Sequence, residues 1–286
     1  MRTDRRPTHR DTPPGASDTR PTGPRAYPVA LTIAGSDSGG GAGIQADLKT
    51  FQELGVYGTS AITAITAQNT HGVHAVHAVP LADVRAQIDA VVSDLRPEAL
   101  KTGMLATAEL VSTVATAIRE HELVRYVLDP VMVATSGDRL LAADAVTTLV
   151  RELLPLADVV TPNLHEAAIL AARPVATVDD MRRAGARILE LGASAVLLKG
   201  GHLEDEAVDL LMDGREERIW RRPRIDTPHT HGTGCTLSAA IAAGLARGDD
   251  LGSAVDRAVR YVSRAIAAAP GLGHGHGPIN HFVDPD

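Results

Sequence analysis

The chain has 286 residues, of which 44% are hydrophobic, and its formal net charge is −7. That size predicts one large domain with a sizeable core, whereas the acidic balance and an aromatic content of 2% argue against nucleic acid as a partner. The single cysteine permits no internal disulfide, and the sequence has neither an apolar run long enough to span a membrane nor a secretory signal. We therefore expect a cytoplasmic protein.

Residues 1–26 contain five prolines, six arginines and hardly any large apolar residues. This composition predicts a disordered N-terminal extension, because so little apolar surface cannot offset the entropy lost on ordering. An arginine-rich start could also be a targeting peptide, but the three aspartates in it argue against that.

From Tyr27 onward, apolar stretches alternate with amphipathic ones, which predicts parallel strands joined by helices. The predicted strands cover residues 28–34, 60–66, 125–131, 157–163 and 194–200. The predicted helices cover residues 44–54, 82–94, 107–120, 142–153, 178–191, 234–247 and 252–268, with a hairpin over 206–221. We expect a single α/β domain over residues 27–286, with three α/β/α layers, a mostly parallel sheet, and ligands at the carboxyl ends of the strands.

The glycine-rich segment IAGSDSGGGAGIQADLKTF, residues 33–51, follows the first predicted strand. Within it, GAGIQA fits the dinucleotide-binding fingerprint, which would indicate a nicotinamide oxidoreductase. Six residues separate this fingerprint from the strand, however, and the second strand ends in Gln68 and Asn69 rather than in an acid that could bind a ribose. Asp37, a carboxylate at a strand end, argues against a loop that is merely flexible.

Four later segments also place polar groups just after an apolar strand: KTGML (101–105), LDPVM (128–132), TPNLHEA (161–167) and LLKGGH (197–202). Alone, Glu166 could be an acid in the first turn of a helix and Asp129 could cap a turn. Together the segments should line one edge of the sheet. The chain has 25 Arg but only three Lys, and all three lie in such segments, where a compact ammonium suits phosphate: Lys49, Lys101 and Lys199.

Cys235 follows a Gly-Thr-Gly turn and begins an alanine-rich helical stretch, a place that attracts anions. With His229 or His231 it could instead form a cysteine hydrolase, but that leaves the lysines and acids unexplained. Cys235 could also be a small structural residue. The whole chain could also be a non-catalytic vitamin-binding protein, which would use Gln68 but would need no anion site. We interpret His71, His74, His77, His274 and His276 as incidental loop residues rather than zinc ligands, since no cysteine accompanies them.

Together with AQNTHGV (67–73), HGTGCTLSAA (231–240) and GPINHF (277–282), these motifs resemble the hydroxymethylpyrimidine and phosphomethylpyrimidine kinases of thiamine biosynthesis. These enzymes belong to the ribokinase-like superfamily, and the resemblance extends from Tyr27 to Phe282. The loop SDSGGGAG departs from the proline or extra serine of many relatives. The resemblance implies a homodimer that uses ATP and Mg²⁺ to phosphorylate the hydroxymethylpyrimidine and then its monophosphate, with pyridoxal kinase as the alternative.

The resemblance also implies roles for individual residues. Gln68 would bind the aminopyrimidine edge between the apolar walls Met104 and Val131, and the other implied substrate-binding positions are Gly35, Asp37, Ala42 and Asp47. Glu166 would hold magnesium through water, with Asp129 as a helper, and Lys199 would face the phosphates. The amides of Gly232, Thr233, Gly234 and Cys235 would form an anion hole. We expect the helix N-terminus to lower the pKa of the Cys235 thiol, so that a thiolate could act as base.

Overall fold

The computed structural model describes residues 26–132, 142–201 and 206–285. Its nine strands form one sheet in the order β3-β2-β1-β4-β5-β6-β7-β8-β9. Strands β1, β2 and β4 to β7 run parallel, whereas β3, β8 and β9 are antiparallel additions at the two edges. The strands are β1 (Val29–Ser36), β2 (Tyr57–Asn69), β3 (Gly72–Ala78), β4 (Ala99–Thr102), β5 (Tyr126–Leu128), β6 (Val159–Val160), β7 (Val196–Gly200), β8 (Glu206–Met212) and β9 (Glu217–Pro223).

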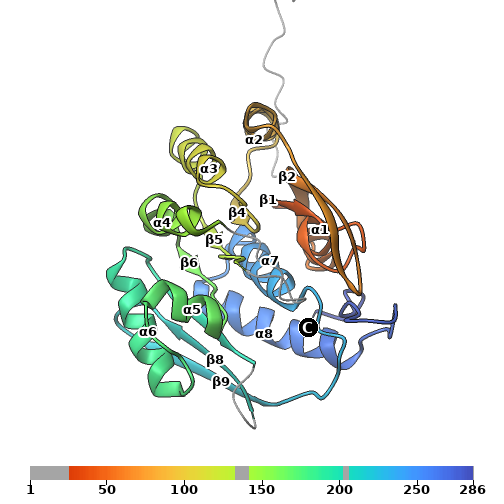
Figure 1. Cartoon of the computed structure of the whole chain (residues 1–286), viewed down its shortest axis with the longest axis vertical. Coiled ribbons are helices and arrows are strands. Elements are labelled where there is room, and N and C mark those ends of the chain that lie inside the picture. The colour runs from red at the N-terminus through yellow and green to blue at the C-terminus, as the bar shows by residue number, and fades with distance from the viewer. Residues whose placement is uncertain (1–25, 133–141, 202–205, 286) are drawn as a thin grey trace, which may run out of the picture.

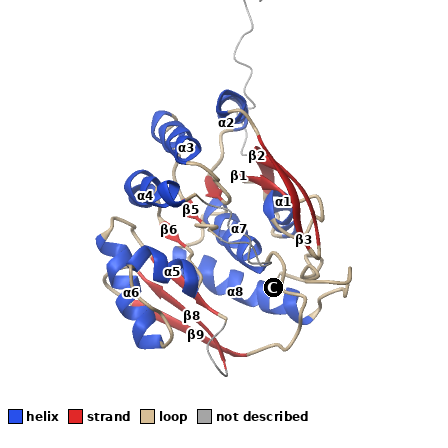
Figure 2. Ribbon diagram, viewed as in Figure 1, coloured by secondary structure: helices blue, strands red, loops and turns tan. Residues whose placement is uncertain are grey.

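Eight α-helices within the described residues cover both faces of this sheet (Figures 1 and 2). One hydrophobic cluster joins one face to α2 (Leu81–Leu95), α3 (Ala108–Glu120), α4 (Ala143–Glu152), α5 (Leu164–Ala171) and α6 (Val178–Glu190). A second cluster joins the other face to α1 (Gly43–Glu53), α7 (Thr233–Ala246) and α8 (Leu251–Ala267). The predicted three-layer α/β/α architecture is therefore confirmed.

Helix α7 is the centre of the second layer. Every residue from Thr236 to Ala246 is buried, as expected of a helix that is apolar on all sides. Its N-cap, Gly232, has a φ of 84°, and a Cβ there would lie 1.7 Å from the carbonyl oxygen of Gly41. Only glycine fits this backbone conformation and this close approach. The start of α7 is thereby packed directly against the glycine-rich loop after β1.

The predicted elements match the structure best where hydrophobic periodicity is long. The predicted helix over 178–191, for example, is α6, and the predicted hairpin is β8 and β9. The predicted strands over 125–131 and 157–163 are much shorter, because Pro130 and Pro162 lack the amide needed to continue the ladder. Strands β3 and β4 and helix α5 were not predicted.

The predicted N-terminal extension, apart from Ala26, lies outside the described residues, as does His202 of the LLKGGH motif. Of the helices in the described ranges, none combines the length and the apolar character needed to cross a bilayer.

Candidate active site

A cavity of about 710 Å³ lies at the carboxyl ends of the parallel strands, where the topology predicted it. It extends from the loop after β1 to the start of α7 and to the hairpin β8–β9. The predicted site residues that line it are Gly35, Asp37, Ala42, Gln68, Met104, Asp129, Val131, Glu166, Lys199, Gly232, Thr233, Gly234 and Cys235. Asp47 is the one predicted site residue outside this lining.

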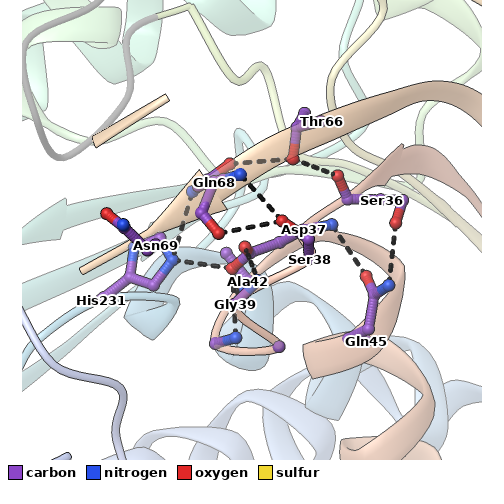
Figure 3. Close-up of polar contacts among 12 residues, drawn as sticks. Ser36, Asp37, Ser38, Gly39, Ala42, Gln45, Thr66, Gln68, Asn69 and His231 are labelled. Carbon is purple, nitrogen blue, oxygen red and sulfur yellow. Dashed lines mark hydrogen bonds and ion pairs between the residues drawn. The ribbon is translucent and has the colours of Figure 1, made fainter. Parts of the chain in front are cut away.

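Asp37 organises the glycine-rich loop at one end of the cavity (Figure 3). Its carboxylate accepts hydrogen bonds from the amides of Gly39 (2.8 Å), Gly41 (3.1 Å) and Ala42 (2.8 Å), and from Nε2 of His231 (2.8 Å). Burial alone would raise the pKa of Asp37, but the hydrogen bonds from His231 and Ala42 hold it below its usual value. Asp37 is therefore an ionised acceptor whose oxygens are already engaged by the protein.

Gln68 lies near the end of β2, next to a β-bulge between Ala67 and Gln68. A bulge re-aims the side chains that follow it, and here Gln68 lines the cavity. Ser38 fixes its backbone, because the Ser38 hydroxyl accepts from the Gln68 amide at 2.8 Å and donates to the Gln68 carbonyl at 2.9 Å. In the side chain, Oε1 lies 3.3 Å from Thr66 Oγ1 and Nε2 lies 3.4 Å from His231 Nε2.

Asp47, predicted to bind substrate, is not among the residues that line the cavity. It is fully buried, because α1 turns Ile44, Asp47 and Phe51 toward the sheet. Both carboxylate oxygens lie 2.9 Å from Nζ of Lys101, which is also fully buried, and one accepts from the Thr32 hydroxyl at 2.6 Å. Asp47 thus compensates the charge of a buried lysine that is among the residues lining the cavity.

Cys235 stands in the first turn of α7, as predicted, and lines the cavity. The prediction that the pKa of its thiol is lowered was wrong. Desolvation by the surrounding protein raises the pKa of Cys235 to about 11, although the nearby charge of Lys101 opposes this. At neutral pH the thiol keeps its proton.

The first turn of α7 supplies backbone donors beside this thiol. The Thr233 amide donates to the Thr230 carbonyl at 3.2 Å. The amides of Gly234 and Cys235 belong to the first turn, whose N–H groups have no acceptor within the helix. They are therefore suited to bind an anion. Lys199 adds a positive charge here. Its Nζ is so close to Gly234 that a Cβ on that glycine would lie 3.2 Å away.

Lys199, Asp129 and Glu166 form a buried charged cluster. Lys199 Nζ donates to Asp129 at 3.0 Å, and Asp129 also accepts from Thr161 (3.3 Å) and Ser238 (3.2 Å). Burial opposes ionisation of Asp129, but the charges of Lys199 and Lys101 bring its pKa below the usual value. Burial also opposes protonation of Lys199, whose pKa is nevertheless raised by Asp129 and Glu166.

Glu166 behaves differently from Asp129. It forms a capping box with Asn163 at the start of α5, accepting from the Asn163 amide at 2.8 Å, and it accepts from the Met132 amide at 3.4 Å. Burial raises its pKa to about 7, Lys199 lowers it, and the charge of Asp129 raises it. Glu166 therefore titrates near neutral pH, whereas Asp129 is held in its ionised form by the two lysines.

The sequence model of the family described as phosphomethylpyrimidine kinase matches residues 37–280. The chain belongs to this family. A relative from Rhizobium meliloti, named hydroxymethylpyrimidine/phosphomethylpyrimidine kinase, is 57% identical over 260 residues, which cover 89% of this chain and 97% of that protein. A relative of the same name from Streptomyces coelicolor is 52% identical over 263 residues, covering 92% and 97%.

Among solved structures, the ADP complex of Bacillus subtilis pyridoxal kinase is similar to this member of the phosphomethylpyrimidine kinase family. The TM-score is 0.84 at 42% identity, and the match covers 90% of this chain and 98% of that one. The family and the ribokinase-like fold expected from the sequence are confirmed.

Two features of this family member's site were not predicted. His231 joins the glycine-rich loop to the start of α7, and it contacts Asp37 and Gln68. Its only sequence signal was its place directly before the Gly-Thr-Gly turn. At the other end, Arg222 pairs with buried Asp209, and both line the cavity. An arginine in a hairpin strand gives no such signal.

Proposed function

We propose that this protein transfers a phosphoryl group from ATP to the hydroxymethyl group of 4-amino-5-hydroxymethyl-2-methylpyrimidine, and then phosphorylates the resulting monophosphate to the diphosphate. The observation that carries this proposal is that one cavity holds an amide able to pair with a ring edge and a helix N-terminus able to hold a phosphoryl group. The two relatives described above, which are 57% and 52% identical to this chain, carry the corresponding kinase name.

The pyrimidine is proposed to bind at the Gln68 end. A side-chain amide both donates and accepts, so it can pair with a ring nitrogen and the adjacent amino group. Met104 and Val131 line the same cavity and supply apolar contact for the ring faces. In this position the hydroxymethyl group would be directed toward the first turn of α7.

The transferred phosphoryl group is proposed to lie at the first turn of α7. The Gly234 and Cys235 amides and the Lys199 ammonium would hold the charge that spreads over the phosphoryl oxygens during transfer. Phosphoryl transfer depends mainly on positioning and charge neutralisation, which suits a site built from amides and buried charges. In the second transfer the acceptor is an anionic phosphate oxygen, so no strong base is needed.

Magnesium is proposed to accompany ATP. The residues present fit this ion, because Asp129 and Glu166 both line the cavity and carboxylate oxygens are ligands that magnesium prefers. Magnesium commonly takes several of its ligands from water and substrate phosphates, so one or two carboxylates are enough. Bound there, magnesium would supply positive charge beside the ATP phosphates.

Cys235 is proposed to contact the hydroxymethyl group. With its pKa raised to about 11, the thiol is a hydrogen-bond donor and a close-packing group at neutral pH. This favours a positional role over that of a general base in the resting enzyme.

Pyridoxal is the second candidate substrate. The observation that favours it is the similarity to the Bacillus subtilis enzyme named pyridoxal kinase, together with a thiol in the cavity that could add to an aldehyde as a hemithioacetal. A homodimer and a cytoplasmic location complete the proposal, and light scattering of the purified protein would test the dimer.

The proposed function is tested by measuring ADP formation with purified enzyme, ATP, Mg²⁺ and one acceptor at a time. We expect turnover with the hydroxymethylpyrimidine and with its monophosphate, at a higher kcat/KM than with pyridoxal. Turnover with pyridoxal alone would assign the second candidate. Absence of turnover with all three acceptors would refute both.

A further inference from the structure

Asp209 and Lys199 stand directly opposite each other in the neighbouring strands β8 and β7. Opposite residues of an antiparallel pair project from the same face of the sheet, with Cβ atoms about 5 Å apart, so a lysine can reach across. Burial raises the pKa of Asp209, whereas the charges of Arg222 and Lys199 act to lower it, so Lys199 lies within electrostatic reach. Yet the Lys199 ammonium donates to Asp129, at 3.0 Å.

Arg222 is the partner of the Asp209 carboxylate. Nη2 of Arg222 donates to Oδ2 of Asp209, and the Gly200 amide donates to Oδ1 at 3.3 Å. A guanidinium and an amide can only donate, so both oxygens of Asp209 accept and the carboxyl group is ionised. Only 7% of this side chain is exposed, so water could not replace the charge of Arg222 if it were removed.

The guanidinium of Arg222 is fixed from its other side by α8. Nη1 donates to the Val259 carbonyl at 3.2 Å and to the Ser263 hydroxyl at 2.6 Å. That hydroxyl donates in turn to the Val259 carbonyl at 2.7 Å. Because the donors of a guanidinium form a rigid, planar fork, the contacts of Nη1 with α8 also fix the direction in which Nη2 points. Arg222 therefore holds Asp209 from a fixed position.

Lys199 thus has two carboxylates within reach, and Arg222 occupies one of them. Without Arg222, a buried carboxylate would lack a compensating cation, and Lys199 lies directly across the ladder from it. We propose that Arg222 is a positioning residue: it holds Asp209 and so leaves the Lys199 ammonium at the start of α7. The inference rests on the proposed function, in which this ammonium holds the charge of the transferred phosphoryl group.

The kinetic test removes the Arg222 charge in two backgrounds. In the wild-type background, Arg222→Gln keeps a donor for α8 but leaves Asp209 without a cation. Lys199 should then turn toward Asp209, and kcat should fall about tenfold or more. In an Asp209→Asn background there is no charge to compensate, so the same change should alter kcat by less than about threefold. Arg221→Gln, the matched control, removes an exposed arginine of the same strand that pairs with Glu206 at 3.0 Å, and should leave kcat unchanged.

Two kinetic results would contradict this role. An equal fall in kcat in both backgrounds would overturn the proposal, because Arg222 would then support transfer through a contact of its own. An unchanged kcat in Arg222→Gln would overturn it as well. Asp209→Asn alone preserves the shape of the side chain and should keep kcat within about threefold of wild type. A tenfold loss in that variant would overturn the proposal even if Arg222→Gln does not fold.

A second measurement follows the Lys199 ammonium and does not depend on activity. The chain has only three lysines, so in ¹³C-lysine-labelled enzyme the Cε resonance of Lys199 can be assigned by its absence in Lys199→Met. It should shift in Arg222→Gln and return to its wild-type position when Asp209→Asn is added, while the Lys49 resonance stays in place. A Lys199 resonance that does not shift, or does not return, would overturn the proposal. If the wild-type enzyme phosphorylates no acceptor, the proposed function fails, while this spectrum still decides whether Arg222 positions Lys199.

Discussion

The two ends of the cavity are built in different ways. At the Gln68 end, one carboxylate, Asp37, is saturated by three amides and a histidine, and the remaining contacts are neutral hydrogen bonds between a loop and a strand. The α7 end has four ionisable groups that are buried or nearly buried: Lys101, Lys199, Asp129 and Glu166. The first end is suited to discriminate one flat ring from another by hydrogen-bond order. The second is suited to hold charge that changes during a reaction.

The segment from His231 to Cys235 joins the two ends. His231 contacts the Gln68 end, and Cys235 lies at the α7 end beside Lys101. Gly232, between them, packs against the Gly41 carbonyl. Five consecutive residues therefore set the distance between a bound ring and a bound phosphoryl group, and each end can be tested separately.

The largest effect should come from the α7 end. Lys199→Met removes the ammonium beside Gly234 and should lower kcat about 10³-fold, with a smaller change in the KM for the pyrimidine. Lys49→Met, which removes an exposed lysine whose Nζ donates to the Gly40 carbonyl at 2.6 Å, is the matched control. A Lys199→Met enzyme with kcat within a few fold of wild type would show that this charge does not support transfer.

Changing the Gln68 end should have a smaller effect and a different signature. Gln68→Leu should lower kcat/KM for the hydroxymethylpyrimidine about 10²-fold, because an apolar side chain leaves the ring edge without its partners. The melting temperature should stay near that of wild type, since Gln68 lines a cavity rather than the core. Steady-state kinetics with unchanged kcat/KM would exclude Gln68 as the residue that binds the ring.

Cys235→Ala should slow both transfers by less than about tenfold. The thiol keeps its proton well above neutral pH, so its removal takes away a contact and not a base. Cys235→Ser, which keeps a donor of similar size, should be slowed even less. A loss of 10²-fold or more that is confined to the first transfer, measured with each purified acceptor, would restore the thiolate as base.

The smallest effect is on stability and depends on pH. The folded protein holds the Glu166 proton more tightly than the unfolded chain does, so this group stabilises the fold fully below its usual pKa of 4.5. That contribution is lost as the pH rises through about 7. Glu166→Gln cannot ionise and keeps an acceptor for the Asn163 amide. Without magnesium and ATP, the melting temperature of the variant relative to wild type should therefore rise by about 5 °C between pH 5 and pH 8. A difference that does not change with pH would contradict the raised pKa.

Much of the fold could be predicted because long apolar periodicities report burial directly. Strand β3 escaped prediction because six of its seven residues are His, Ala or Val in a run with no buried face. Strand β4 has four residues, one of them a buried lysine, so its pattern is too short and too polar. Strands β5 and β6 are shorter than predicted. The apolar pattern continues up to Pro130 and Pro162, which lack the amide needed to extend the sheet.

The placement of the candidate site residues could be predicted where it follows from their position in the sheet, since polar residues after parallel strands meet at one edge. It could not be predicted where the role depends on distant contacts. Asp47 faces inward only because α1 packs on the sheet above Lys101. His231 bonds a residue 194 positions away in the sequence. For Cys235, the sequence gives the helix start but not the desolvation that raises its pKa.

We propose that the Gln68 end binds the ring and the α7 end binds phosphate. The most direct test is to titrate ATP and the hydroxymethylpyrimidine separately into Gln68→Leu and Lys199→Met by calorimetry. Gln68→Leu should bind the pyrimidine at least about tenfold more weakly and ATP within about twofold of wild type, because the two groups lie at different ends of the cavity. Lys199→Met should weaken ATP binding and leave pyrimidine binding within about twofold. If either variant weakens both ligands equally, the cavity does not have two separable ends, and the account is wrong.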